Sequence, residues 1–270
     1  MSRLPKNKTV IPSVTLWLLD GSLVHEDDIG FFATQLGASE ARRYGAFRRQ
    51  ERKRQFLLGR MLVRFAVSRL LSLPPDTLGV VERDGNAPRL VLADSQSAQP
   101  SFSLSHSGDW VACAVSSSGN LGVDIELNDP TRSILDVSRV AFHPNEYAWL
   151  LQQSEAGRLS AFYQLWCARE ALFKLMTALG RESLLLPLVG VDGTLTLHGP
   201  GWYGYTLAHF DLTIAVCSDR PLPAVQKMEL DGLSRADWLA SGGESLEQIT
   251  TTPINERHAD ARCAAINHDD

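Results

Sequence analysis

Two acidic residues two positions apart, Asp124 and Glu126, lie in the alternating apolar segment 121–127. Alternate residues of a strand point to the same face of a sheet, so both carboxylates can bind one hard divalent cation. Without a cation the two charges repel, and each carboxylate raises the pKa of the other. The same pattern also occurs on ordinary solvated strand faces. The pair therefore indicates either a metal site or two surface acids.

A second candidate is the segment 166–174, which has the sequence Trp-Cys-Ala-Arg-Glu-Ala-Leu-Phe-Lys. Glu170 and Lys174 are four residues apart, a spacing at which helical side chains commonly form a weak surface ion pair. Arg169 falls on the apolar stripe of the same helix, where a charge is costly unless it meets a carboxylate or a phosphate. The alternative is ordinary amphipathic packing, with Arg169 extended to water.

Serine alternates with other residues in the segment 101–107, which predicts a strand with Ser105 on one face and His106 on the other. Because neighbours in a strand point to opposite faces, the two cannot form the nucleophile–base hydrogen bond of a serine hydrolase. The chain also has no Gly-x-Ser-x-Gly sequence. His106 can instead donate to a phosphate, or it can be a core histidine with satisfied hydrogen bonds.

A dense group of basic side chains leads into a predicted helix. The group consists of Arg42, Arg43, Arg48, Arg49, Arg52, Lys53 and Arg54. Arginine-rich helix starts can bind phosphates in a bidentate manner. A solvated helix face explains most of these residues equally well, so the pattern does not assign them individually.

The elements that must position these side chains follow from hydrophobic periodicity. Long amphipathic helices are predicted over 56–70 and 160–179, and a further helical pattern covers 135–151. A surface loop is predicted over 84–100. Strands are predicted over 10–19, 101–107, 110–115, 121–127, 189–197, 202–210 and 212–217. Each half thus has a strand, a long helix and further strands, which predicts a duplicated α+β fold.

The composition is that of a globular protein and excludes several classes of function. Hydrophobic residues make up 44% of the chain, and a formal charge of −5 argues against a nucleic-acid binder held by net charge. The apolar stretches are much shorter than the roughly 20 residues that span a bilayer, so we expect no membrane segment. The N-terminal segment lacks the apolar core of a signal peptide, and the four cysteines form no CxxC pair. We therefore expect a cytoplasmic protein with free thiols.

The segment 228–270 has a different composition, with nine acidic and three basic residues and few large apolar ones. This pattern predicts a mobile tail, so truncation after Lys227 is expected to leave a folded protein. Without that segment, 23 basic and 22 acidic residues remain, and the rest of the chain is close to neutral.

Three motifs follow one another in a specific order. They are Ser-Leu-Ser-His-Ser over 103–107, Gly-Val-Asp-Ile-Glu over 122–126 and Trp-x-x-Arg-Glu-Ala-x-x-Lys over 166–174. Together they resemble the 4′-phosphopantetheinyl transferases of the surfactin type, with a likeness that leaves out the tail. The resemblance implies an α+β pseudo-dimer of two similar halves, each a small antiparallel sheet packed with a long helix. On this basis the chain divides into an N-terminal half (1–105), a C-terminal half (106–227) and an acidic, disordered tail (228–270).

The resemblance also implies an activity. Enzymes of this family transfer the 4′-phosphopantetheine group from coenzyme A to a serine of an apo acyl or peptidyl carrier protein, with Mg²⁺, and release 3′,5′-ADP. Such holo-carrier-protein synthases serve fatty-acid, polyketide or peptide biosynthesis. We accordingly expect a monomeric enzyme whose partners are coenzyme A and a carrier protein, with no nucleic acid and no membrane.

Individual residues acquire expected roles from the same resemblance. The metal ligands would be Asp124, Glu126 and Glu170. The phosphates of coenzyme A would contact Ser105, His106 and Lys174, and Arg54 matches a basic position near the 3′-phosphate. In the reaction, His106 and Lys174 would supply positive charge, and Glu170 would take the proton of the attacking serine.

Two positions depart from the family pattern. Arg169 replaces the lysine that precedes the helix glutamate, and an arginine does not give up a proton. The segment 85–88 has Gly-Asn-Ala-Pro where the family often has Gly-Lys-Pro. Two other functions remain open: a catalytically silent sensor of coenzyme A or nucleotides, and a metal-dependent phosphohydrolase that uses the same acids.

Overall fold

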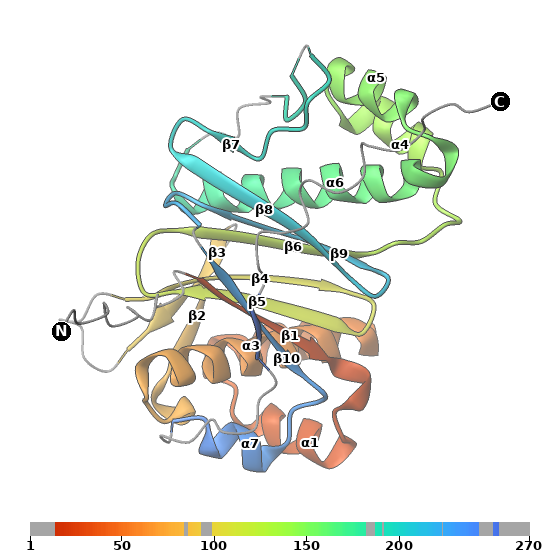
Figure 1. Cartoon of the computed structure of the whole chain (residues 1–270). Coiled ribbons are helices and arrows are strands. Elements are labelled where there is room, and N and C mark those ends of the chain that lie inside the picture. Colours follow the sequence, from red (N-terminus) through yellow and green to blue (C-terminus); the bar gives the residue numbers. More distant parts are fainter. Residues whose placement is uncertain are drawn as a thin grey trace, which may run out of the picture.

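Two β-sheets stack between two long helices in the computed structural model, which describes residues 14–83, 86–92, 99–181, 187–190, 192–222, 224–242 and 251–253. The order of layers is α6 (Glu155–Ala178), one sheet, the other sheet and α3 (Gln50–Leu71), as Figure 1 shows. Each helix and the sheet that it covers form one lobe of the molecule. We call the lobe of α3 the first lobe and that of α6 the second lobe.

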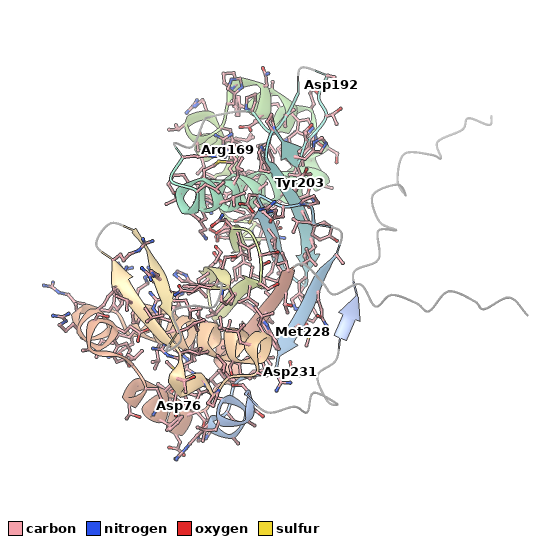
Figure 2. All side chains as sticks on the ribbon, turned by 90° about the vertical axis from the view of Figure 1, so that its left-hand side faces the viewer. Asp76, Arg169, Asp192, Tyr203, Met228 and Asp231 are labelled. Carbon is pink, nitrogen blue, oxygen red and sulfur yellow. The ribbon has the colours of Figure 1, made fainter. Side chains whose placement is uncertain are left out.

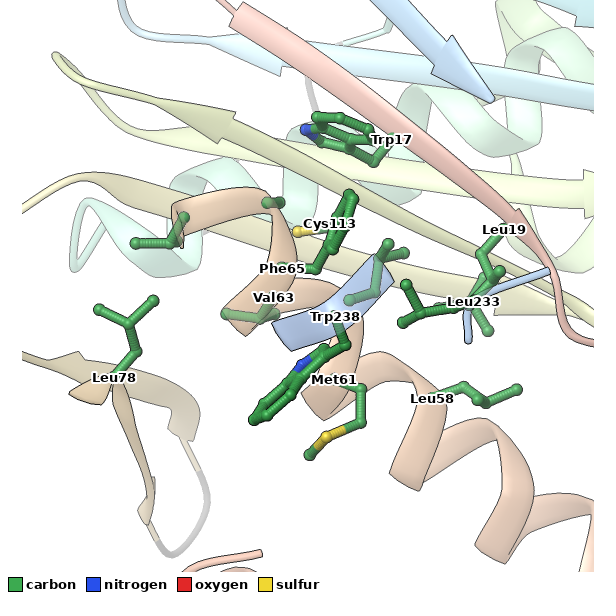
Figure 3. Packing of buried hydrophobic residues seen from close by; sticks show 14 of the residues in the cluster. Trp17, Leu19, Leu58, Met61, Val63, Phe65, Leu78, Cys113, Leu233 and Trp238 are labelled. Carbon is green, nitrogen blue, oxygen red and sulfur yellow. The ribbon is translucent and has the colours of Figure 1, made fainter. Parts of the chain in front are cut away.

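The first lobe has a five-stranded sheet with strand order β11-β10-β1-β5-β4. Its strands are β1 (Val14–Asp20), β4 (Ser101–Ser107), β5 (Trp110–Ser116), β10 (Val225–Leu230) and β11 (Thr251–Pro253). Around it lie α1 (Glu26–Thr34), α2 (Ala38–Ala46), α7 (Arg235–Ala240), the hairpin of β2 (Gly79–Arg83) and β3 (Asn86–Val91), and two short 3₁₀ helices, η1 (Gly21–Leu23) and η2 (Pro75–Thr77). The core between sheet and α3 includes an edge-to-face contact of Trp17 with Phe65 (Figure 3).

The second lobe has a four-stranded antiparallel sheet with strand order β6-β9-β8-β7. Its strands are β6 (Leu121–Leu127), β7 (His198–Gly199), β8 (Trp202–His209) and β9 (Leu212–Ser218), and its shorter helices are α4 (Ile134–Ala141) and α5 (Pro144–Gln152). Helix α6 packs closely on β6, because Gly122 has no side chain to hold it away. A Cβ at Gly122 would overlap Ala171 O and lie 2.8 Å from Leu175 N.

A third core lies between the two sheets. Because successive strand residues point to opposite faces, β1 sends Leu16 and Leu18 into this core and Trp17 and Leu19 toward α3. Strand β6 adds Val123 and Ile125 from the other sheet. Burial on both faces explains why residues 16–19 of β1 are all apolar.

The α+β prediction is confirmed, with two long helices on two sheets. The boundary that the sequence predicts between the two halves, after residue 105, falls inside β4. The chain passes from one sheet to the other between β5 and β6. The predicted loop over 84–100 contains β3, and the pattern over 135–151 is broken into α4 and α5, since Pro144 begins the second helix. In place of the strand predicted over 189–197, the described residues have a single bridge between Val189 and Leu195.

The prediction of a disordered tail is wrong for residues 228–242. Strand β10 pairs in parallel with β1, and the side chain of Trp238 is completely buried against Phe31 and Phe32. Figure 2 shows Met228 and Asp231 beside the first lobe. The composition gave the wrong answer because a few apolar residues, correctly spaced, suffice to pack into the core of the first lobe. Residues 243–250 and 254–270 lie outside the described residues.

The expectation about thiols is confirmed for Cys113, Cys167 and Cys217, which are free and buried. Cys263 lies outside the described residues. Among the helices that are described, none is both long and apolar enough to cross a membrane.

Candidate active site

A cleft of about 510 Å³ opens between α3 and α6, along strand β4 and the start of β6. Its apolar lining includes Phe47, Phe56, Phe102, Leu104 and Phe173. Its polar lining includes Arg52, Ser105, His106, Asp124 and Lys174. Residues of all three sequence motifs therefore line one cleft, although Glu126 and Glu170 are not among them. This lining can take a ligand with both apolar and anionic parts.

Three alternate serines of β4 face β6 and join the two lobes. Ser103 Oγ accepts from Val123 N at 3.0 Å, Ser105 Oγ donates to Asp124 Oδ1 at 2.7 Å, and Ser107 Oγ donates to Glu126 Oε2 at 2.8 Å and accepts from Leu127 N at 3.0 Å. Strands β4 and β6 are edge strands of different sheets, so hydroxyl groups take the place of a backbone ladder here. We call these contacts the serine seam.

Asp124 is the most constrained acid of the cleft. Its side chain is 8% exposed, and Oδ1 accepts from Ser105 and from Lys174 Nζ, the latter at 2.8 Å. Lys174 also donates to Leu104 O at 3.3 Å and to Val123 O at 2.9 Å, so it bridges the two lobes. Asp124 Oδ2 is buried and has no hydrogen-bond partner among the described residues. A buried carboxylate oxygen of this kind is costly unless something binds it.

Glu126 and Glu170 are half-buried beside Asp124. Burial raises the pKa of Glu126; the hydrogen bond from Ser107 lowers it, and the charge of Asp124 raises it further. Burial and then the charge of Asp124 also raise the pKa of Glu170. Burial, and then the charges of Asp124 and Glu126, raise the pKa of the neighbouring Cys167 thiol, which therefore stays neutral. The charge of Asp124 thus acts on both glutamates, and a cation would relieve this repulsion.

His106 lies at the cleft in contact with Arg52, whose Nη1 is 2.8 Å from His106 Nε2. A guanidinium can only donate, so Nε2 accepts and the ring is neutral with its proton on Nδ1. Loss of hydration, followed by the charges of Arg52 and Lys174, lowers the pKa of His106. The excess positive charge at this point belongs to Arg52 rather than to His106.

Arg54 does not line the cleft, in contrast to its expected place near a phosphate. Its guanidinium donates to Gly21 O and Val24 O and pairs with Glu26, which fixes the start of α1 to α3. Arg52, two residues earlier, lines the cleft instead. Sequence reasoning included Arg52 only as one member of the basic run.

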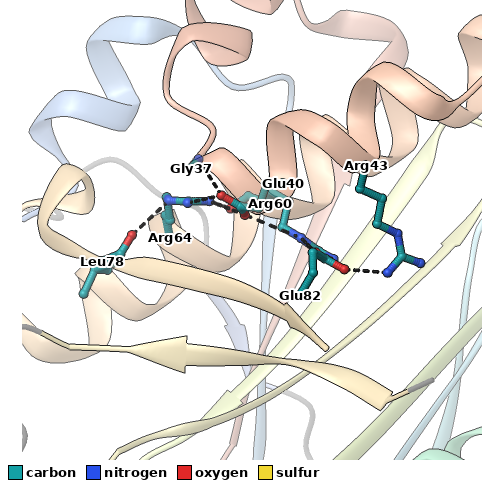
Figure 4. Close-up of polar contacts among 7 residues, drawn as sticks. All are labelled: Gly37, Glu40, Arg43, Arg60, Arg64, Leu78 and Glu82. Atoms are coloured by element: carbon teal, nitrogen blue, oxygen red, sulfur yellow. Dashed lines mark hydrogen bonds and ion pairs between the residues drawn. The ribbon is translucent and has the colours of Figure 1, made fainter. Parts of the chain in front are cut away.

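Two further arginines of the cleft wall, Arg43 and Arg60, are held by Glu82 of β2. Arg60 also lies over the Phe56 ring, with Cζ 4.5 Å from its centroid. Figure 4 shows how the chain of contacts continues through Glu40 to the buried Arg64. This network, which the sequence did not reveal, places positive charge and an aromatic face side by side in the cleft.

Arg169 pairs with a buried carboxylate, as expected for a charge on the apolar stripe of a helix. Its Nη1 lies 2.7 Å from both carboxylate oxygens of the fully buried Glu146 on α5. Glu146 also accepts from His143 N at 2.8 Å and from Leu188 N at 2.7 Å. Arg169 therefore joins α5 to α6 and does not line the cleft.

The acidic group at the cleft offers hard oxygen donors, the ligands that Mg²⁺ prefers. In the described part of the chain, no three His, Cys, Asp or Glu side chains are clustered closely enough to hold a metal ion as they stand. The unpartnered, buried Asp124 Oδ2 nevertheless fits a cation, as does the repulsion that Asp124 exerts on Glu126 and on Glu170.

Two family models match the chain. The model for the 4′-phosphopantetheinyl transferase superfamily matches residues 120–199, and the model for the N-terminal part of 4′-phosphopantetheinyl transferases matches residues 25–118. The two matches meet where the chain passes from β5 to β6.

Curated relatives give the same result. The chain is 31% identical over 171 residues to the 4′-phosphopantetheinyl transferase AcpT of Salmonella typhimurium, covering 63% of this chain and 79% of the relative. It is 28% identical over 187 residues to a 4′-phosphopantetheinyl transferase of Bacillus subtilis, covering 65% and 78%. It is 30% identical over 118 residues to the 4′-phosphopantetheinyl transferase gsp of Aneurinibacillus migulanus, covering 44% of this chain. The chain spans only 46% of gsp and 65% of a relative from Synechocystis.

Proposed function

The chain belongs to the 4′-phosphopantetheinyl transferase superfamily, and from this premise we propose that it transfers the 4′-phosphopantetheine group of coenzyme A to a serine hydroxyl of an apo acyl or peptidyl carrier protein. The observation that carries the proposal is the cleft in which Asp124, with its unpartnered Oδ2, faces Lys174 and lies near Arg52 and His106. Phosphoryl transfer requires acidic side chains that bind a metal ion and positive charge that stabilises the phosphate oxygens.

The cleft suits coenzyme A, which combines a base, several phosphates and an uncharged arm. Arg52, with the neutral His106 beside it, would bind phosphate oxygens. Ser105, which also lines the cleft, would lie close to the same oxygens. The wall of Phe56, Arg43 and Arg60 would pack against the less polar parts of the ligand. Arg52 takes the role that the sequence suggested for Arg54.

Asp124, Glu126 and Glu170 would hold Mg²⁺, since their oxygens are hard ligands and the charge of Asp124 repels both glutamates without it. When bound, Mg²⁺ neutralises charge on the pyrophosphate oxygens. Lys174 would keep Asp124 in orientation and add positive charge, because all three of its donors are directed to the junction of the lobes.

In the proposed reaction the serine oxygen of the carrier forms a bond to the β-phosphorus of coenzyme A, and the bond to 3′,5′-ADP breaks. Glu170, on the face of α6 that turns toward Asp124, would accept the serine proton. One chain supplies both walls of the cleft, so the monomer is the proposed active form. The proposed place of action is the cytoplasm.

The test is to incubate the full chain with an apo carrier protein, coenzyme A and Mg²⁺ and to weigh the carrier by mass spectrometry. We expect a gain equal to one phosphopantetheine group, and no gain with Asp124→Ala that folds as judged by circular dichroism. A panel of fatty-acid, polyketide and peptide carriers identifies the preferred partner. If no carrier of the panel gains mass, the proposal is wrong.

A further inference from the structure

The serine seam contains an asymmetry that the proposed reaction does not by itself explain. All three serines stand on one face of β4, and all three contact β6. Ser105 and Ser107 donate to carboxylates, whereas Ser103 only accepts from a backbone amide. The two carboxylates that receive these hydrogen bonds are the expected metal ligands of the strand, Asp124 and Glu126.

We propose that Ser107 and Ser105 are positioning residues that orient the Glu126 and Asp124 carboxylates, so that strand β4 of the first lobe sets the cation affinity of the acids on the second lobe. The inference rests on the proposed function only in taking these acids as a divalent-cation site. It concerns residues that do not themselves bind the cation.

The geometry of Ser107 carries the first part of the argument. Its hydroxyl donates to Glu126 Oε2 at 2.8 Å and at the same time accepts from Leu127 N at 3.0 Å. A serine hydroxyl has one proton, so the acceptor bond from the backbone fixes the direction in which that proton points. Ser107 therefore binds one oxygen of Glu126 in a fixed direction and limits the rotation of the carboxylate.

Asp124 carries the second part. Ser105 and Lys174 both donate to Oδ1, which leaves the buried Oδ2 as the oxygen without a partner. Two donors on one oxygen fix the plane of the carboxylate and direct the other oxygen away from them. Hydrogen bonds to ligating carboxylates are a general means of orienting metal ligands, and their removal typically lowers metal affinity by about 10-fold to 100-fold.

Ser103 is the matched control within the same strand. Its hydroxyl holds the Val123 amide at 3.0 Å, so Ser103→Ala loosens the seam without removing a donor from either carboxylate. Ser107→Thr keeps a hydroxyl at the position and serves as the rescue variant. Ser107 is only partly buried, so Ser107→Ala should fold even if the buried Ser105→Ala does not.

The experiment titrates the full chain with Mn²⁺ alone and measures free Mn²⁺ by electron paramagnetic resonance, without coenzyme A or a carrier. We expect Asp124→Ala to abolish the binding seen in wild type, and Ser107→Ala and Ser105→Ala to raise the dissociation constant by about 10-fold or more. Ser103→Ala and Ser107→Thr should stay within about 2-fold of wild type, well below the losses of about 10-fold to 100-fold expected when a donor to a ligand is removed.

Three results would overturn the inference. Ser107→Ala could bind Mn²⁺ with the affinity of wild type, or Ser103→Ala could lose as much affinity as Ser107→Ala. The third is that Asp124→Ala still binds Mn²⁺ as wild type does. A separate readout is the Mg²⁺ requirement of transfer, which should rise in Ser107→Ala while the rate at saturating Mg²⁺ recovers. If Mn²⁺ affinity changes as expected but no carrier is modified, the positioning role stands and the proposed function fails.

Discussion

At the scale of single residues, the site depends on how charges are balanced. Lys174 uses its three donors on two backbone carbonyls and Asp124, and Arg169 is bound to Glu146, so neither cation is free for a diffusing anion. Arg52 has a neutral histidine and an amide as its neighbours, since it contacts His106 and Gln55. Among the cations of the cleft, Arg52 is therefore the one whose interaction energy increases most when a phosphate binds.

Arg52→Gln is expected to raise the KM for coenzyme A by about 10-fold, because it removes a charge-assisted hydrogen bond worth roughly 1.5–3 kcal/mol. Arg54→Gln is the matched control two residues away. It should leave this KM unchanged and lower the free energy of unfolding by about 1–3 kcal/mol, since Gly21 O and Val24 O lose their donor. Steady-state kinetics and urea unfolding measure the two effects. Equal KM values for Arg52→Gln and wild type would refute the assignment.

At the scale of elements, the position of the acids depends on how closely α6 lies against β6. The strand carries Asp124 and Glu126, the helix carries Glu170 and Lys174, and the two sets meet only because Gly122 allows the backbones to touch. A Cβ added at Gly122 would clash with backbone atoms of the helix. Backbone atoms cannot relieve a clash by changing rotamer, as side-chain atoms can.

Gly122→Ala is expected to destabilise the protein by several kcal/mol, about as much as severe overpacking of a core. It should also abolish transfer by separating Asp124 and Glu126 from Glu170 and Lys174. Gly30→Ala is the control: Gly30 lies exposed in α1 with nothing within 4 Å of an added Cβ, so a gain of about 0.5–1 kcal/mol is expected. Urea unfolding checks both values, and a Gly122→Ala variant as stable as wild type would contradict the close packing.

At the scale of the whole molecule, two features join the lobes away from the cleft. The chain leaves the second lobe after β9 and returns to the first lobe as β10 and α7. At the end of β8, His209 Nδ1 lies 2.9 Å from Lys227 Nζ and Nε2 lies 3.0 Å from Glu229 on β10. Lysine can only donate, so this histidine is neutral and its Nε2 proton points to Glu229.

Acid is expected to weaken this junction. Burial, then the charge of Lys227, lowers the pKa of His209, and Glu229 only partly opposes the shift. In the unfolded chain histidine binds its proton near pH 6.5, so below that pH the unfolded state holds more protons and stability falls until the folded pKa is reached. Urea unfolding at about pH 5 and about pH 8 should show a smaller acid loss in His209→Gln than in wild type. An identical loss in both proteins would exclude this role.

Truncation after Lys227 should unfold or strongly destabilise the first lobe, contrary to the expectation from composition. It removes half of β10 and the buried side chains of Met228, Leu233 and Trp238. Loss of the tryptophan alone corresponds to about 3–5 kcal/mol. A chain ended after Pro253 keeps every described element and is the control. Yield of soluble protein and thermal unfolding distinguish the two, and a stable chain of residues 1–227 would contradict the fold.

The pattern of residues along the chain was enough to predict most of the local elements. Periodicity alone placed the two long helices and most strands, because the face that an element buries is set by its own spacing of apolar residues. Of the residues singled out in the sequence, Ser105, His106, Asp124 and Lys174 line one cleft, whereas Glu126, Glu170 and Arg54 do not line it. Arg52 and Arg54 cannot be told apart by residue type, yet on a helix they point about 200° apart, since each residue turns the helix by about 100°.

Tertiary structure decided which partner each long side chain meets. The Glu146 that binds Arg169, the Glu82 that holds Arg60 and the groove that buries Trp238 come from segments distant in sequence. Composition describes a segment in isolation, and it therefore missed a C-terminal region whose few apolar residues complete another lobe's core. Charge pairing and burial depend on distances in space, which the order of residues along the chain does not contain.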